Sequence, residues 1–128
     1  MNREVSAAWR KVASEAMDAA CSLTSKNPRG VCNRVYYAAY AHAHSLLLEV
    51  GERPRAQHGT WSHDKLPAVI RSALARTMGT QSARKLAQLV ERVRKHRVAA
   101  DYEPTAVIGE ADSLRLIGAV RLALEGRT

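Results

Sequence analysis

The chain has 128 residues, of which 46% are hydrophobic and 25% are charged, and its formal net charge is +8. This length fits one domain with a single core, and the composition argues against intrinsic disorder. No apolar run reaches the roughly 18 residues of a membrane span, and the N-terminus lacks the pattern of a signal peptide. We therefore expect a single domain over residues 1–128 that is cytoplasmic and makes no membrane contact.

The first half of the chain predicts two long helices. Apolar residues at helical spacing indicate a first helix over residues 3–26. The second helix is expected to begin after Asn27, with Pro28 in its first turn, and to end at Gly51 as a left-handed cap. The apolar faces expected for these helices consist of Val5, Trp9, Val12, Ala16 and Leu23, and of Tyr36, Tyr40, Ala43, Leu47 and Val50.

A loop and a weaker helix are expected to follow. Residues 52–61 contain two chain breakers, Pro54 and Gly59, and are predicted to form the loop. Ser62 is a candidate cap for a third helix that carries its apolar residues at helical spacing and is closed by Gly79. That apolar face consists of Leu66, Val69, Ile70 and Leu74.

The last third of the chain predicts two more helices. A fourth begins at Thr80 or Ser82 and is stopped by Pro104, and Thr105 is the candidate cap of a fifth. The fifth has its apolar face at Val107, Ala111, Leu114, Ile117, Val120 and Leu124. Short connections between long amphipathic helices favour antiparallel neighbours. The expected fold is therefore all-α, an up-and-down bundle of four long helices plus one short helix.

Arg97 occupies an unexpected position on the fourth helix. The apolar stripe Leu86, Leu89, Val90 and Val93 continues at the same spacing onto Arg97. Because arginine is almost never fully buried unless it is paired, two interpretations stay open. Arg97 either forms an intrahelical ion pair with Asp101, four residues later, or contacts a phosphate.

The positive charge is concentrated around this position. Residues 84–97 contain six Lys or Arg and one Glu, a net charge of +5, whereas residues 101–110 contain three acids and no base. Such a cluster favours a polyanion such as RNA, or an acidic protein surface, and the alternative is a solvated helix face. Within the cluster we expect Arg94 and Lys95 to contact phosphates.

The cysteines and histidines give little support for a metal site. Cys21 and Cys32 lack a CxxC spacing, so we interpret both as small core residues. His42 and His44 lie about 200° apart on a helix and cannot hold one ion together. We expect neither a metal nor another cofactor.

Histidine and tyrosine side chains nevertheless provide candidate ligand contacts. His58 and His63 flank Trp61, and together with nearby arginines they are suited to stacking on a base and touching phosphate. The alternative is that Trp61 tucks this loop under the bundle. The cluster Tyr36, Tyr37 and Tyr40 is more typical of a core or a dimer seam than of a base platform.

Three segments together resemble the HEPN domain, in its small stand-alone prokaryotic branch. They are residues 33–44 (NRVYYAAYAHAH), the pair His58-Gly59, and residues 97–102 (RVAADY). The resemblance implies a helical bundle that homodimerises. Its members act as RNA-cleaving toxins, as defence effectors or as nucleotide-binding partners of a minimal nucleotidyltransferase. Those with nuclease activity carry Arg, then four to six intervening residues, then His, and they need no metal.

The sequence departs from that pattern at two positions. Tyr102 stands where the motif that starts at Arg97 has its histidine, and Ala41 stands where many relatives have a histidine after the aromatic residue. His42 is one residue away, which turns its side chain by about 100° around the helix. A phenol with a pKa of about 10 is a poor general base near neutral pH. Catalysis is therefore put in question, whereas ligand binding is not.

We favour a homodimeric module that binds RNA or a nucleotide in a basic groove between subunits. Arg97 and Tyr102 are the residues expected to react if the site is catalytic. The candidate binding residues are Arg34, Tyr37, His42, His58, Arg94, Lys95 and Asp101. One alternative is a metal-independent endoribonuclease toxin whose base is displaced to His42, His58, His63 or His96. Another is a protein-interaction partner of a nucleotidyltransferase.

Overall fold

The structure is a computed structural model that describes residues 2–55 and 59–126. Over these residues it contains six helices and no strand, which confirms the predicted all-α class. The helices are α1 (Asn2–Leu23), α2 (Pro28–Glu49), α3 (Leu66–Ala73), α4 (Ala75–Met78), α5 (Thr80–Tyr102) and α6 (Glu110–Leu124). None of them combines the length and the apolar character that a membrane-spanning helix needs.

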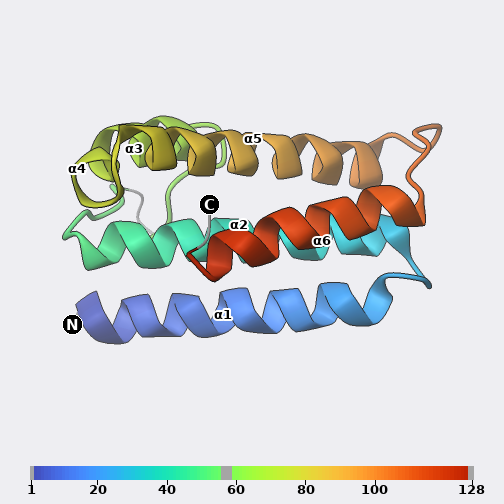
Figure 1. Cartoon of the computed structure of the whole chain (residues 1–128), viewed down its shortest axis with the longest axis horizontal. Helices are drawn as coiled ribbons and strands as arrows, with labels where there is room; N and C mark the ends of the chain where they lie inside the picture. Colours follow the sequence, from blue (N-terminus) through green and yellow to red (C-terminus); the bar gives the residue numbers. More distant parts are fainter. Residues whose placement is uncertain (1, 56–58, 127–128) are drawn as a thin grey trace.

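The four long helices alternate in direction, and α2 lies at their centre (Figure 1). It packs against α1, α5 and α6, and α3 and α4 pack against α5. Most of α2 is buried, and Val35, Tyr36 and Leu47 have no exposed surface. The angle of a residue around the axis of α2 therefore determines which neighbouring helix it faces, and so to which site it belongs.

The predicted ends of α2 are confirmed. The side chain of Asn27 accepts a hydrogen bond from the backbone N–H of Gly30 at 2.9 Å, and Pro28 occupies the first turn. After Glu49 the chain turns at Gly51, whose φ of +89° lies in the left-handed region that favours glycine. These local signals fix where the central helix starts and stops.

Several helix boundaries differ from the prediction, beginning with α1, which ends at Leu23 and not at residue 26. The expected short helix begins at Leu66, because Ser62 accepts backbone hydrogen bonds from Lys65 and Leu66 in a turn, and it is interrupted at Leu74 into α3 and α4. The last helix begins at Glu110, since the carboxylate of Asp112 accepts from the N–H of Gly109 at 3.1 Å, whereas Thr105 had been expected as the cap.

The apolar faces predicted for α1 and α6 are partly wrong. Val5 and Val12 are 49% and 43% exposed, and Leu114 is 53% exposed. Val107 belongs to the loop before α6 and is almost fully exposed. The face of α1 that packs on α2 contains mostly small side chains, which let two helices approach closely. It consists of Ser6, Ala13, Ala16, Met17 and Ala20. Cys21 is exposed, contrary to expectation, while Cys32 is buried.

Candidate functional site

Arg97 lies on α5 in a shell of aromatic rings and one carboxylate. Its Nε donates to Asp101 Oδ2 at 3.0 Å, so the predicted ion pair is present. Its guanidinium carbon is 5.8 Å from the ring centroids of Tyr36 and Tyr102 and 5.7 Å from that of Tyr37. With 18% of its side chain exposed, Arg97 is a partly desolvated cation that ring faces stabilise.

The carboxylate of Asp101 is itself held from α2. Asn33 Nδ2 donates to Asp101 Oδ2 at 3.4 Å, which links the last turn of α5 to the first half of α2. The ion pair uses only the Nε of Arg97, and no described residue forms a hydrogen bond with either Nη atom. The two interpretations of Arg97 are therefore compatible, because a residue paired through Nε still offers its Nη hydrogens to an anion.

Tyr36 connects Arg97 to a histidine from the loop before α3. The Tyr36 hydroxyl forms a short hydrogen bond with His63 Nδ1. Burial raises the pKa of Tyr36, so its hydroxyl stays protonated. Burial, followed by the positive charges of Arg94 and Arg97, lowers the pKa of His63 from its usual value near 6.5, so the imidazole is neutral at pH 7.

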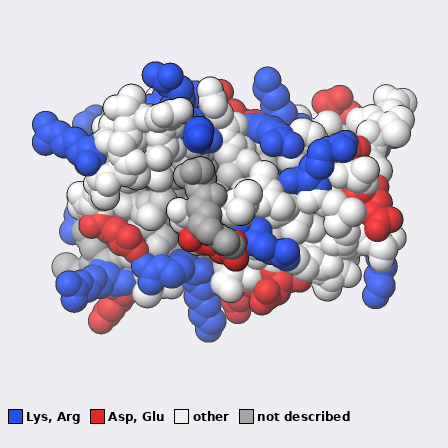
Figure 2. Space-filling model, viewed as in Figure 1, with Lys and Arg blue, Asp and Glu red and all other residues white. Residues whose placement is uncertain are grey.

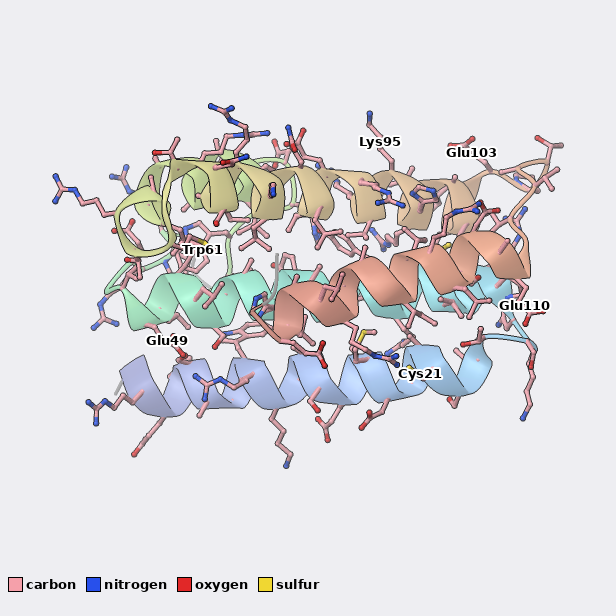
Figure 3. The ribbon with its side chains drawn as sticks, viewed as in Figure 1. Cys21, Glu49, Trp61, Lys95, Glu103 and Glu110 are labelled. Carbon is pink, nitrogen blue, oxygen red and sulfur yellow. The ribbon has the colours of Figure 1, made fainter. Side chains whose placement is uncertain are left out.

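The loop that carries His63 is fastened to α2 by two hydrogen bonds between side chains of α2 and the backbone of Trp61. Tyr40 donates from its hydroxyl to the carbonyl of Trp61 at 2.9 Å, and the N–H of Trp61 donates to His44 Nε2 at 3.1 Å. His44 in turn donates from Nδ1 to the carbonyl of Tyr40 at 2.9 Å. Trp61 lies between α2 and the α3–α4 layer (Figure 3), so it does tuck the loop under the bundle.

These anchors form a row on α2. Tyr36, Tyr40 and His44 follow one another at intervals of four residues, so they lie on one face of the helix. The buried His44 has a pKa lowered by burial to about 4, although its hydrogen bond to Tyr40 works in the opposite direction. It is therefore neutral, as an acceptor for the Trp61 N–H must be.

Other predicted residues lie around this cluster. Tyr37 contacts Arg97, and it also lines a shallow groove of about 460 Å³ together with Arg34 and Val12. Arg94, one turn before Arg97, lines a groove of about 530 Å³ between α3 and α5. Lys95 belongs to the same groove and extends away from the bundle (Figure 3).

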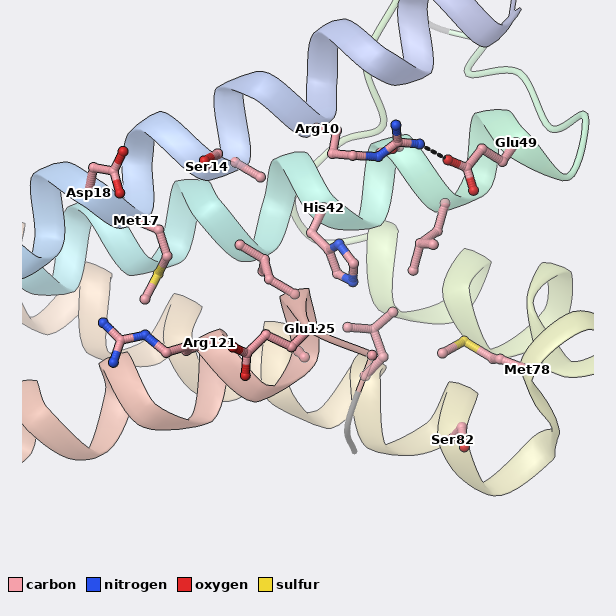
Figure 4. Close-up of a pocket in the computed structure, with 17 residues that line it drawn as sticks. Arg10, Ser14, Met17, Asp18, His42, Glu49, Met78, Ser82, Arg121 and Glu125 are labelled. Atoms are coloured by element: carbon pink, nitrogen blue, oxygen red, sulfur yellow. Dashed lines mark hydrogen bonds and ion pairs between the residues drawn. The ribbon is translucent and has the colours of Figure 1, made fainter.

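His42 is not brought to Arg97. It points into a groove of about 770 Å³ between α1 and α6, where Arg10 and Glu49 form an ion pair (Figure 4). Its position is about 140° around the axis of α2 from Tyr37. Burial lowers the pKa of His42, with opposing effects from Glu49 and Arg10. The predicted site residue His58 lies outside the described residues.

Positive charge is present on the surface of α5 without being uniform. Its exposed cations are Arg84, Lys85, Arg92 and Lys95. Figure 2 shows Lys and Arg side chains along the edge over α3 to α5, with Asp and Glu side chains between them. In the part of the chain that the structure describes, no three His, Cys, Asp or Glu side chains gather as metal ligands.

Sequence reasoning missed two members of the cluster and undervalued a third. Asn33 and the hydroxyl of Tyr36 were not predicted as site groups, and His63 was considered only beside Trp61 or as a displaced base. The interval of four between Tyr36, Tyr40 and His44 was the available signal. It places two phenol hydroxyls and one imidazole on the same helix face, where their polar atoms require hydrogen-bond partners.

Comparison with known proteins identifies the domain. No curated protein and no solved structure matches the chain. A family model described as the HEPN domain matches residues 6–125, which is nearly the whole sequence. The match includes the Arg97 cluster, by which we mean Arg97 and the residues around it, Asn33, Tyr36, Tyr37, His63, Asp101 and Tyr102. The chain therefore belongs to the HEPN domain family.

Proposed function

We propose that this HEPN domain is a homodimeric module that binds RNA or a nucleotide, with a phosphate group held by Arg97. The observation that carries the proposal is the state of the guanidinium, which is fixed by Asp101 and three tyrosines and has both Nη atoms unengaged by any described residue. Arginine recognises phosphate through two parallel N–H donors, and it does so best when its position is fixed beforehand.

Aromatic surface beside the cation supports a nucleotide over a simple anion. Tyr102 is 68% exposed, although its ring is only 5.8 Å from the guanidinium carbon of Arg97. Stacking on an exposed ring stabilises an unpaired base by about 1–3 kcal/mol. A nucleotide can therefore place its phosphate on Arg97 and its base on Tyr102.

Further phosphates of a longer strand would meet Arg94 and Lys95. Both cations line the groove between α3 and α5, and Arg94 lies one turn from Arg97 on the same helix. Contacts of this kind do not depend on base identity, and salt weakens them. They favour RNA over a single nucleotide as the ligand, in a toxin–antitoxin or defence setting such as the family resemblance implies.

The surface next to the site supports dimerisation. Val5 and Val12 of α1 are about half exposed, and the groove beside Val12 contains Arg34, Glu15 and Tyr37. In a two-fold dimer each subunit presents this surface to its copy, so each Arg34 can pair with the copy's Glu15. Since Tyr37 also contacts Arg97, the two candidate sites would lie beside the interface.

The test is the affinity for a fluorescent single-stranded RNA of about 20 nucleotides, measured by anisotropy in EDTA. Arg97→Met keeps the side-chain volume on α5 and removes the charge, and it should weaken binding about 10-fold or more. Arg84→Met removes an exposed cation at the other end of α5 and is the matched control. Equal affinity in both variants would show that Arg97 is only a structural ion-pair residue.

A further inference from the structure

The hydrogen bond between Tyr36 and His63 has a direction that the surroundings determine. Tyr36 has no exposed surface, and His63 Nδ1 is the one hydrogen-bond partner of its hydroxyl among the described residues. A buried hydroxyl hydrogen needs an acceptor, because leaving it unpaired is costly. Tyr36 therefore donates, and Nδ1 accepts with its lone pair.

This direction fixes the tautomer of the imidazole. In a neutral histidine one ring nitrogen carries the hydrogen and the other accepts, so an accepting Nδ1 places the hydrogen of His63 on Nε2. Nε2 has no hydrogen-bond partner among the described residues. No buried side-chain nitrogen or oxygen in the described part of the chain lacks a partner, so Nε2 is accessible from outside the protein.

We propose that His63 is a second phosphate-binding residue of this site, donating from Nε2–H to an oxygen of the phosphate that Arg97 holds. The inference rests on the proposed function of Arg97. Tyr36 links the two residues, since its hydroxyl bonds His63 while its ring lies 5.8 Å from the guanidinium carbon of Arg97. A neutral donor beside two arginines supplies a directed hydrogen bond without adding a third charge.

The groups around His63 all fit this role. Tyr36 and Tyr40 face its ring, with the Tyr40 centroid at 4.9 Å, and the charges that act on it come from Arg94, Arg97 and Asp64. Both cations act on the imidazole, so they also attract an oxyanion to its surroundings. The same tautomer argues against His63 as the displaced base of a ribonuclease, because the accessible nitrogen already carries a hydrogen and the lone pair is occupied by Tyr36.

The experiment has a spectroscopic part and a binding part. Long-range ¹H–¹⁵N correlation spectra of the ring at pH 7 should show a protonated Nε2 and an unprotonated Nδ1 for His63. An unprotonated Nε2 would overturn the proposal. Affinity for the same fluorescent RNA should fall about 10-fold in His63→Leu and less in His63→Gln, whose amide N–H can take the place of Nε2–H.

His96→Leu is the matched control, because His96 is also half-buried and lies on α5 near Asp112 of α6. Its RNA affinity should be unchanged. If Arg97→Met weakens binding while His63→Leu does not, the inference about His63 is wrong and the proposed function stands. If Arg97→Met binds normally, the proposed function itself fails, whatever the His63 spectra show.

Discussion

Two sites on opposite sides of α2 contain the same residue types in different arrangements. On one side Arg97 is held by Asp101 through Nε, and His63 is held by Tyr36. On the other side Arg10 is paired with Glu49, and His42 points into a larger groove. Cavity size would favour the second site. The surroundings of the arginine favour the first site, because the guanidinium of Arg97 is partly buried among aromatic rings and its Nη atoms keep hydrogens to donate.

The difference teaches that an arginine and a histidine near one another do not define a site. What counts is whether neighbouring residues hold each side chain while leaving its functional atoms free. In the Arg97 cluster Asp101, Asn33 and Tyr36 have this supporting role. Arg10 also bonds its carboxylate, that of Glu49, through one nitrogen, but its side chain is 63% exposed, so the guanidinium is not held by a surrounding shell as that of Arg97 is.

The largest expected effect concerns the histidine that anchors the loop of the first site. His44 has a pKa of about 4 in the folded protein and about 6.5 when unfolded, so folding favours its neutral form. Stability is complete above pH 6.5 and decreases as the pH falls from 6.5 toward 4, by about 3 kcal/mol from this group. Urea unfolding followed at pH 7, 5.5 and 4.5 measures the loss.

Substitution separates His44 from the second site. His44→Asn should lower the stability at pH 7 and flatten its dependence on pH, because the titrating group is gone. His42→Asn should retain most of that dependence, although the lowered pKa of His42 contributes in the same direction. A steep dependence that persists in His44→Asn would mean that the Trp61 loop does not rely on a neutral His44.

The next effect compares the two arginines directly. Loss of a hydrogen-bonded charge contact costs about 1.5–3 kcal/mol, which is roughly 10- to 100-fold in affinity. Arg97→Met should show this loss for single-stranded RNA, whereas Arg10→Met should bind like the unchanged protein. The reverse result would move the RNA site to the groove between α1 and α6.

The sequence predicted the helices that carry the two sites better than the side-chain contacts within them. Asn27, Pro28 and Gly51 fix the ends of α2 through interactions within a few residues, so pattern alone found them. The position of His63 depends on hydrogen bonds that join the side chains of Tyr40 and His44 to the backbone of a loop about 20 residues away, which no local pattern encodes. His42 was assigned to the wrong neighbours because each step along a helix turns a side chain by about 100°.

Packing explains the misassigned faces of α1. Val5 and Val12 are largely exposed, whereas the residues of α1 that are buried are mostly small, such as Ala13 and Ala20. The spacing of apolar residues therefore predicted the helix α1 correctly, but it predicted only part of its buried face. The ion pair of Arg97, in contrast, followed from the spacing alone, because Asp101 is one turn away.

A smaller effect is expected from the cations that extend the first site. Arg94→Glu combined with Lys95→Glu should weaken RNA binding to a similar degree for all sequences and reduce the salt slope by about 1.4, for two phosphate contacts on a single strand. Arg3→Glu combined with Lys11→Glu changes the net charge equally at exposed positions of α1. If this control reduces the slope as much, binding depends on total charge and not on the Arg97 side.

The smallest effect tests whether a single substitution can turn the first site into a nuclease site. Tyr102 is five residues after Arg97, within the spacing at which nuclease members of the family carry histidine, and it is 68% exposed. An imidazole there would keep a pKa near 6.5 and act as a base beside the guanidinium. Tyr102→His should therefore cleave RNA slowly in EDTA, faster as the pH rises through 6.5, whereas Tyr102→Phe should not. If the double variant with Arg97→Met still cleaves RNA, the cleavage does not come from this site. If Tyr102→His binds RNA but does not cleave it, the site serves binding alone.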